Sequence, residues 1–140
     1  VNVIHGSSIL TAVGETGLQL YKFGKIASMP RWNNEKKFEP VSFIETVMEN
    51  KSIGAHSLIL VDIGLKFKDA IKQLKISADK NNFKNIGKVI VCSKLGTQQN
   101  KIWWDFIESF EEKNINAPFC IIIPGKLHFM EKEFLRGFEA

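Results

Sequence analysis

Hydrophobic residues along this chain follow two patterns, short continuous runs and stretches with helical spacing. Continuous apolar runs are typical of strands that are covered on both faces of a sheet, and they occupy residues 57–61, 89–92 and 120–123. Shorter runs at residues 1–4 and 26–29 predict two further strands. The chain therefore offers several strands for one buried sheet.

Helical spacing occurs in three stretches. Ser42 and Glu45 form a capping box that opens a helix ended by Gly54, and Asn81-Asn82 ends a second helix. Apolar residues three and four apart line one face of each helix. These faces are Phe43, Ile44, Val47 and Met48, then Phe67, Ala70, Ile71, Leu74 and Ala78, and then Met130, Phe134 and Phe138 in a terminal helix.

Residues 101–114 permit two interpretations. Their apolar positions fit one face of a helix, whereas the Trp103-Trp104 pair equally fits a strand that leads into a shorter helix. Elsewhere, helices alternate with apolar strands. That alternation predicts an α/β fold, a layered mixed sheet with flanking helices and several parallel strand pairs. Because the strand at residues 1–4 has no preceding partner, we expect the native protein to continue upstream.

Composition and charge narrow the possibilities. A chain of 140 residues with 44% hydrophobic residues can fill one core, and no apolar run approaches the roughly 20 residues of a membrane span. The net charge of +4 comes from scattered lysines, so no direct nucleic-acid binding is predicted. Cys92 and Cys120 lie in apolar runs without zinc-ligand spacing, which predicts buried free thiols in a reducing cytoplasm.

Small and polar residues follow three predicted strands, at the position where layered α/β sheets bind ligands. They are His5-Gly6-Ser7-Ser8, Lys94-Leu95-Gly96-Thr97 and Pro124-Gly125-Lys126-Leu127-His128. Glycines allow backbone N–H groups to approach a ligand, so the three strand exits together suggest one binding edge. Each exit alone is equally typical of a helix cap or a simple turn.

Titratable residues give less specific signals. The three histidines have no metal-ligand spacing, so no metal site is predicted. His56 is expected to cap the loop before its strand, whereas His128, at a helix start, is placed to donate to a ligand. Asp62 ends a strand, where either a catalytic acid or a turn cap is found. No Ser/His/Asp or Cys/His/Asn nucleophile pattern and no Walker-type loop is present.

Three stretches of the chain resemble the diphthine synthase family. The first, residues 8–25, contains Ser-Ile, Ala-Val-Gly, Thr-Gly-Leu-Gln and Tyr-Lys-Phe-Gly in order. The second joins a Pro-x-Ser-Phe helix start at residues 40–43 to a His-x-Leu-x-Leu-x-Asp-Ile strand at residues 56–63. The third, Ile-Pro-Gly-Lys-Leu-His at residues 123–128, resembles the archaeal form of the family.

The resemblance implies a fold and an activity. Members of this family have a two-domain tetrapyrrole-methylase-like fold, form homodimers and bind S-adenosylmethionine between their domains, leaving S-adenosylhomocysteine as product. They methylate the amino group of a 3-amino-3-carboxypropyl-modified histidine of translation elongation factor 2, in diphthamide biosynthesis. We therefore expect residues 1–140 to be the C-terminal domain of such a methyltransferase, without its N-terminal domain, and to bind the cofactor poorly alone.

Site residues are carried over by motif. The resemblance implies cofactor contacts at Ser8, Ile9, Val61, Leu95 and His128, with the two apolar residues Val61 and Leu95 packing on the adenosine. The catalytic base stays unknown, with His128 and Asp62 as candidates.

Two departures from the family pattern stand out. Ser93-Lys94 replaces the family's Ala-Arg, and the segment after Asp62 lacks the Met-Thr-Ala-Asn stretch that is common in the family. In addition, nothing in this chain matches the Gly-Asp-Pro loop of the family's N-terminal domain. Two alternative functions remain besides that of a diphthine synthase: a methylase of another small substrate, such as a corrin precursor, and a non-catalytic dimerisation module.

Overall fold

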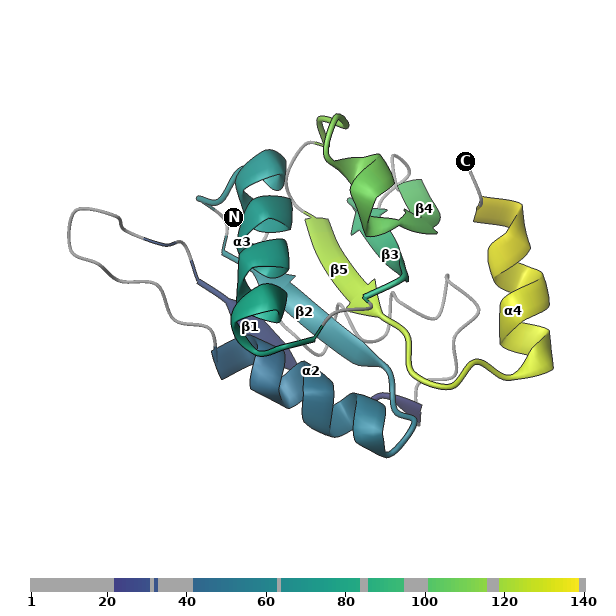
Figure 1. Cartoon of the computed structure of the whole chain (residues 1–140). Coiled ribbons are helices and arrows are strands. Elements are labelled where there is room, and N and C mark those ends of the chain that lie inside the picture. Colours follow the sequence, from purple (N-terminus) through teal and green to yellow (C-terminus); the bar gives the residue numbers. More distant parts are fainter. Residues whose placement is uncertain are drawn as a thin grey trace, which may run out of the picture.

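The computed structural model describes residues 22–30, 32, 42–62, 64–83, 86–94, 101–115 and 119–138. Strands and helices alternate along much of the chain, with one pair of consecutive strands (Figure 1), and η denotes a 3-10 helix. The elements are β1 (Ala27–Met29), α2 (Ser42–Ser52), β2 (Ser57–Val61), α3 (Phe67–Lys80), β3 (Lys88–Ser93), β4 (Lys101–Phe106), η3 (Ile107–Phe110), β5 (Phe119–Ile123), α4 (Phe129–Leu135) and η4 (Arg136–Phe138).

The described strands form one five-stranded sheet in the order β1-β2-β5-β3-β4. β1 pairs with β2 in parallel, whereas β2–β5, β5–β3 and β3–β4 are antiparallel. The predicted mixed α/β sheet is therefore confirmed, but the expectation of several parallel strand pairs is wrong for these strands. β5 inserts between β2 and β3 in the opposite direction, and a continuous apolar run reports burial on both faces rather than the direction of a neighbour.

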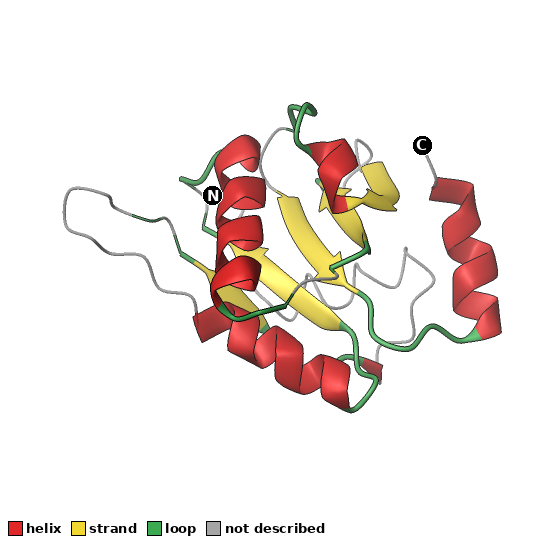
Figure 2. Ribbon diagram, in the orientation of Figure 1, coloured by secondary structure: helices red, strands yellow, loops and turns green. Residues whose placement is uncertain are grey.

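Alternate residues of the central strands enter two separate cores. Ile59, Val91 and Ile121 face the larger core, which α2, α3 and η3 cover. Leu58 and Ile122 face the smaller core, where Trp104 of β4 and Leu135 of α4 are also buried. Helices therefore lie on both sides of the strands (Figure 2), which explains why these strands are apolar at every position.

The helix predictions are confirmed for α2 and α3. All five residues of the predicted apolar face of α3 are buried, and so are Phe43, Ile44 and Val47 of α2. Phe67 at the start of α3 makes edge-on ring contacts with Phe110 and Phe119, at centroid distances of 6.1 and 5.2 Å. These contacts tie the helix to η3 and β5. Of the two interpretations of residues 101–114, the strand followed by a short helix is correct.

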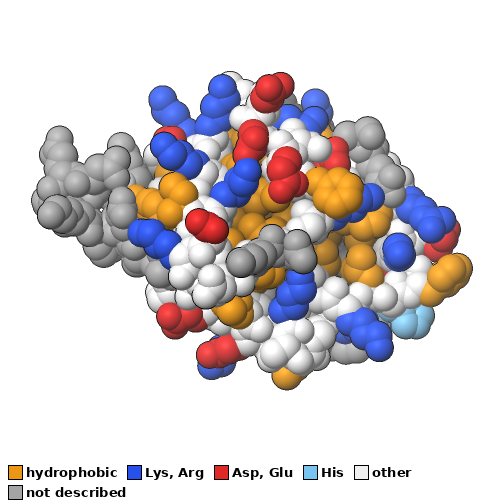
Figure 3. Space-filling view, viewed as in Figure 1, with side chains coloured by type: hydrophobic (Ala, Val, Ile, Leu, Met, Phe, Trp, Pro, Cys, Tyr) orange, Lys and Arg blue, Asp and Glu red, His pale blue; other side chains and the backbone are white. Residues whose placement is uncertain are grey.

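The terminal helix α4 forms as predicted, but its buried side differs from the predicted apolar stripe. Met130 and Phe134 are 65% and 52% exposed, and Phe129 is also exposed, whereas Leu135 is fully buried. Hydrophobic side chains accordingly lie at the surface around this helix, on the right in Figure 3. The inward side of α4 instead carries Glu131 and Leu135, one turn apart.

Cys92 and Cys120 lie opposite each other in the β3–β5 register, and both are buried and form no disulfide, as predicted. None of the helices in the described ranges is long and apolar enough to cross a membrane.

Candidate functional site at the turn after β5

The turn between β5 and α4, residues 124–128, lies directly against the turn between α2 and β2. The N–H group of Lys126 donates to the carbonyl oxygen of Gly54 at 3.1 Å. The N–H group of Gly125 donates to Nδ1 of His56 at 2.9 Å. A side chain at position 125 would meet the carbonyl oxygen of Ala55, so the close approach of the two turns requires glycine there.

His56 is fully buried at the start of β2 and joins this turn to α4. Because the backbone N–H of Gly125 can only donate, Nδ1 of His56 is the acceptor and the ring proton lies on Nε2. Nε2 then donates to Oε2 of Glu131 at 2.9 Å. The contact is therefore a hydrogen bond from a neutral imidazole N–H to a carboxylate rather than an ion pair.

Glu131 is only 1% exposed and receives donors from three directions. Besides His56, the ammonium of Lys22 lies 3.0 Å from Oε1, and the backbone N–H of His128 donates to Oε1 at 2.9 Å. A buried carboxylate is tolerated only when it is paired and hydrogen-bonded, and removing one partner of such a pair costs about 3–5 kcal/mol. Lys22 also donates to the carbonyl oxygen of Lys126 at 3.2 Å, so the same ammonium contacts the turn itself.

His128 is the N-cap of α4. Its Nδ1 accepts from the N–H of Met130 at 3.2 Å, and Glu131 reciprocates by binding the backbone N–H of His128, which completes a capping box. With Nδ1 occupied as an acceptor, the proton of the neutral ring lies on Nε2. The side chain is exposed. The geometry therefore favours a role for His128 as a donor to a ligand over the alternative role of a general base.

Residues 22–25 complete the assembly. The N–H of His56 donates to the carbonyl oxygen of Lys22 at 2.9 Å, and the N–H of Gly24 returns a bond of 3.0 Å to His56. The ring of Phe23 lies edge-on to that of His56, at 5.4 Å between centroids. Segments from all three stretches that carried the family resemblance therefore meet at one place, although they are about 30 to 100 residues apart in the sequence.

Asn50 of α2 fixes the relative position of two of these segments. Its side-chain amide donates to the carbonyl oxygen of Lys25 at 2.8 Å and to the hydroxyl of Ser57 at 3.0 Å. Its Oδ1 accepts from the N–H of Lys25 at 3.0 Å. No role for Asn50, Lys22 or Glu131 was predicted from the sequence. Two signals could have pointed to them: Lys22 lies in the family-like Tyr-Lys-Phe-Gly stretch, and Glu131 stands three residues after the helix-capping His128.

The other predicted cofactor contacts lie elsewhere or outside the described residues. Val61 ends β2, which advances about 3.3 Å per residue, so it lies roughly 16 Å along the strand from His56. Its half-buried side chain packs against the larger core. Because β5 is antiparallel to β2, its exit lies at the opposite end of β2 from Val61. Ser8, Ile9 and Leu95 lie outside the described residues, so nothing is added to these predictions.

The prediction of a single binding edge is therefore wrong for the two strand exits that the structure describes. The exit of β3, at Lys94 with φ of 54°, lies at the same end of the sheet as Val61. The exit of β5 lies at the other end, with His128. The cause is again the reversed direction of β5, since carboxyl ends share an edge only between parallel strands.

Asp62 is exposed, and its Oδ1 accepts from the N–H of Gly64 at 3.1 Å. This is the bonding of a turn-forming aspartate, so the geometry supports the turn-cap interpretation over that of a catalytic acid.

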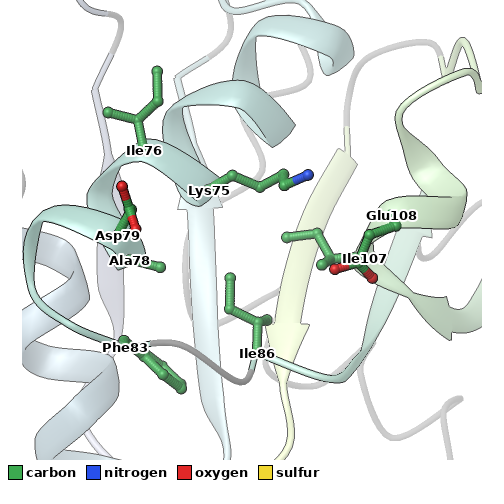
Figure 4. Close-up of a pocket in the computed structure, with 8 residues that line it drawn as sticks. All are labelled: Lys75, Ile76, Ala78, Asp79, Phe83, Ile86, Ile107 and Glu108. Carbon is green, nitrogen blue, oxygen red and sulfur yellow. The ribbon is translucent and has the colours of Figure 1, made fainter.

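The described residues also enclose an open groove of about 440 Å³ between α3 and η3. Figure 4 shows its lining, in which Lys75 and Glu108 come from opposite walls. None of the predicted site residues lines it. Within the described ranges, no group of three His, Cys, Asp or Glu side chains is placed to hold a metal ion.

No protein-family model matches the chain, but individual proteins do. The diphthine synthase of Methanocaldococcus jannaschii is 36% identical over 97% of this chain, and that of Methanococcus aeolicus is 34% identical over 97%. The chain is a homologue of the diphthine synthases. It spans 57% of the length of the M. jannaschii relative and 56% of the M. aeolicus relative. The homologues are not confined to archaea, since an Arabidopsis thaliana protein named probable diphthine methyl ester synthase is 29% identical over 99% of the chain.

Solved structures agree with this relationship. A crystal structure of a diphthine synthase has a TM-score of 0.79 and 28% identity to this homologue, covering 96% of this chain and 53% of that one. A protein from Entamoeba histolytica, provisionally named a diphthine synthase, has a TM-score of 0.87 and 25% identity, covering 100% of this chain and 60% of its own. The predicted fold class is therefore confirmed by both topology and relatives.

Proposed function

We propose that the chain is the C-terminal domain of an S-adenosylmethionine-dependent methyltransferase of diphthamide biosynthesis. Its substrate is the amino group of the 3-amino-3-carboxypropyl-modified histidine of translation elongation factor 2. The observation that carries this proposal is the convergence of the three family-like stretches at the turn that bears His128. Homology to diphthine synthases over 97% of the chain supports it.

The chemistry asked of this chain is binding and orientation. When bound, S-adenosylmethionine supplies an electrophilic methyl group. Rate acceleration then depends on aligning that group with the acceptor amine and excluding water, for which no covalent intermediate with the protein is needed. His128 fits such a ligand because its side chain is exposed, its backbone is held by Glu131, and its Nε2 proton points away from the cap.

The remaining cofactor contacts are part of the same proposal. Ser8, Ile9 and Leu95 contribute as the family motif implies, and Val61 contributes through its backbone, because its side chain packs against the larger core. The protein acts in the cytoplasm as a homodimer. The exposed Phe129, Met130 and Phe134 of α4 provide apolar surface for a contact between chains.

A chimera tests the proposal. This chain is fused to the part of the M. jannaschii diphthine synthase that it does not cover, and transfer of a radiolabelled methyl group to elongation factor 2 carrying the 3-amino-3-carboxypropyl histidine is measured. Transfer is expected from the chimera, with weak or no binding of S-adenosylmethionine by the 140-residue chain alone.

Three results would contradict the proposal or part of it. A folded chimera that methylates a corrin precursor but not the elongation factor would indicate a methylase of another substrate. A folded chimera that binds no S-adenosylmethionine would indicate a non-catalytic module. Calorimetric binding by the isolated chain as tight as that of the chimera would contradict the assignment of this chain to one wall of a two-domain cleft.

A further inference from the structure

We propose that His56, Glu131 and Lys22 form a positioning network that holds the turn at residues 124–128 in one conformation and so fixes the direction of the His128 ring. The identity of the ligand that His128 contacts rests on the proposed function. The network itself does not, since it is defined by contacts within this chain.

The backbone contacts of the turn show that these three side chains hold it in place. Five polar backbone contacts of the turn run to other described parts of the chain or to α4: the N–H groups of residues 125, 126 and 128, and the carbonyl oxygens of Lys126 and His128. Three of the five end on side chains, namely those of His56, Glu131 and Lys22. The other two have backbone partners, Gly54 for the N–H of Lys126 and Lys132 for the carbonyl oxygen of His128. The turn is therefore held mainly by side chains.

Burial supports positioning over simple stabilisation. His56 is fully buried and Glu131 is 1% exposed, so the network places an imidazole and a carboxylate where apolar side chains of similar volume would fold at lower cost. Hydrogen bonds are directional, whereas apolar contacts are not. A fully satisfied buried network therefore specifies one geometry. In this protein the specified geometry is that of the residues leading to His128.

The network is also continuous from the turn to the helix cap. His56 connects the N–H of Gly125 to Oε2 of Glu131, and Oε1 of Glu131 receives the N–H of His128. The ammonium of Lys22 donates to the same Oε1 and to the carbonyl oxygen of Lys126, which lies between residues 125 and 128 of the turn. A change at His56 is therefore transmitted to His128 without any direct contact between the two rings.

Two isosteric substitutions separate the two bonds of His56. In His56→Asn, the amide oxygen occupies the place of Nδ1 and still accepts from Gly125, but the donor to Glu131 is lost. In His56→Gln, the amide nitrogen occupies the place of Nε2 and still donates to Glu131, but the acceptor for Gly125 is lost. Amide hydrogen exchange in the 140-residue chain, followed by NMR, reports on each bond separately.

We expect His56→Gln to raise the exchange rate of the Gly125 amide about tenfold, as loss of one buried hydrogen bond implies, and His56→Asn to raise that of the His128 amide instead. Lys22→Met, at a side chain that is 23% exposed, should also accelerate exchange at His128 and serves if both His56 variants fail to fold. The amide of Ile121, in the middle of β5, is the internal control. Imidazole nitrogen shifts of the unaltered chain should show the His56 proton on Nε2.

Three results would overturn the inference. They are equal acceleration at Gly125, His128 and Ile121 in each variant, unchanged exchange at Gly125 and His128 in folded variants, and a His56 proton on Nδ1. Affinity of the chimera for S-adenosylmethionine gives the link to function, with about tenfold weaker binding expected for His56→Gln. If the unaltered chimera binds no S-adenosylmethionine while the exchange pattern holds, the proposed function fails and the network stands.

Discussion

Gly125 lies so close to Ala55 that a methyl group on its Cα would be 2.3 Å from the carbonyl oxygen of Ala55. The carbonyl oxygen of Gly54 would be only 2.6 Å away. Both are backbone atoms, which cannot rotate aside as the end of a side chain can. Gly125 is therefore required for space and not for an unusual backbone angle, because it is not among the residues with positive φ.

Gly125→Ala should consequently push the turn away from β2. We expect a loss of about 1–3 kcal/mol in the free energy of unfolding, the usual cost of inserting a methylene into a packed region. Gly137→Ala is the matched control, because nothing lies within 4 Å of its added methyl group, and it should be neutral or stabilising by up to about 1 kcal/mol. Urea denaturation measures both. Equal losses in the two variants would show that the close contact does not exist.

A second test concerns Asn50, whose hydrogen bonds connect Lys25 to the start of β2. Asn50→Ala leaves both polar backbone groups of Lys25 and the hydroxyl of Ser57 without this partner. We expect the free energy of unfolding to fall by about 1–3 kcal/mol. Glu49→Ala, at the exposed neighbouring position, should change it by less than about 0.5 kcal/mol. A value for Asn50→Ala within that same range would mean that the three bonds are not formed in solution.

The rotation of α4 about its axis is tested by two substitutions on one helix. Leu135→Ala should cost about 2–5 kcal/mol, because it opens a cavity beneath a fully buried side chain. Met130→Gln should cost less than about 0.5 kcal/mol, because Met130 is mostly exposed. The opposite order of the two costs would restore the predicted stripe of Met130, Phe134 and Phe138 as the buried face.

That stripe shows where prediction from the sequence ends. The helical spacing of apolar residues in α3 predicts its buried face correctly, because Phe67, Ile71 and Leu74 are all buried and its other face carries lysines. In α4, the apolar stripe is exposed in part while the side with Glu131 and Leu135 is buried. This orientation depends on Glu131, whose partners His56 and Lys22 are distant in the sequence. A local pattern contains no information about such partners, so it favours the stripe as the buried face.

The topology of the sheet could likewise be predicted only in part from local sequence patterns. The apolar runs of β2, β3 and β5 correctly predicted buried strands, because burial on both faces leaves a local signal. The direction of β5 leaves none, and it determines whether Val61 and His128 share an edge. Family motifs supplied His128 without any geometry. They also contain Lys22 and His56 but not Glu131, and the hydrogen bonds that join these residues to the turn are visible only in the structure.

His128 is the N-cap of α4 and the proposed hydrogen-bond donor to a ligand, and substitutions can separate these two roles. Asparagine is among the preferred N-cap residues, and its amide oxygen can accept from the N–H of Met130 in place of Nδ1. His128→Asn should therefore leave the free energy of unfolding within about 0.5 kcal/mol of the original while removing the Nε2 donor. His128→Ala loses both roles and should cost about 0.5–2 kcal/mol.

Binding of S-adenosylmethionine to the chimera then decides whether the donor matters. Loss of one hydrogen bond to the ligand is worth about 1 kcal/mol, so affinity measured by calorimetry should fall several-fold to tenfold in His128→Asn although the protein is as stable as before. Stability and binding should fall together only in His128→Ala. If His128→Asn binds as tightly as the unaltered chimera, the ring serves α4 alone, and the cofactor contact that the family motif implies is not made by this side chain.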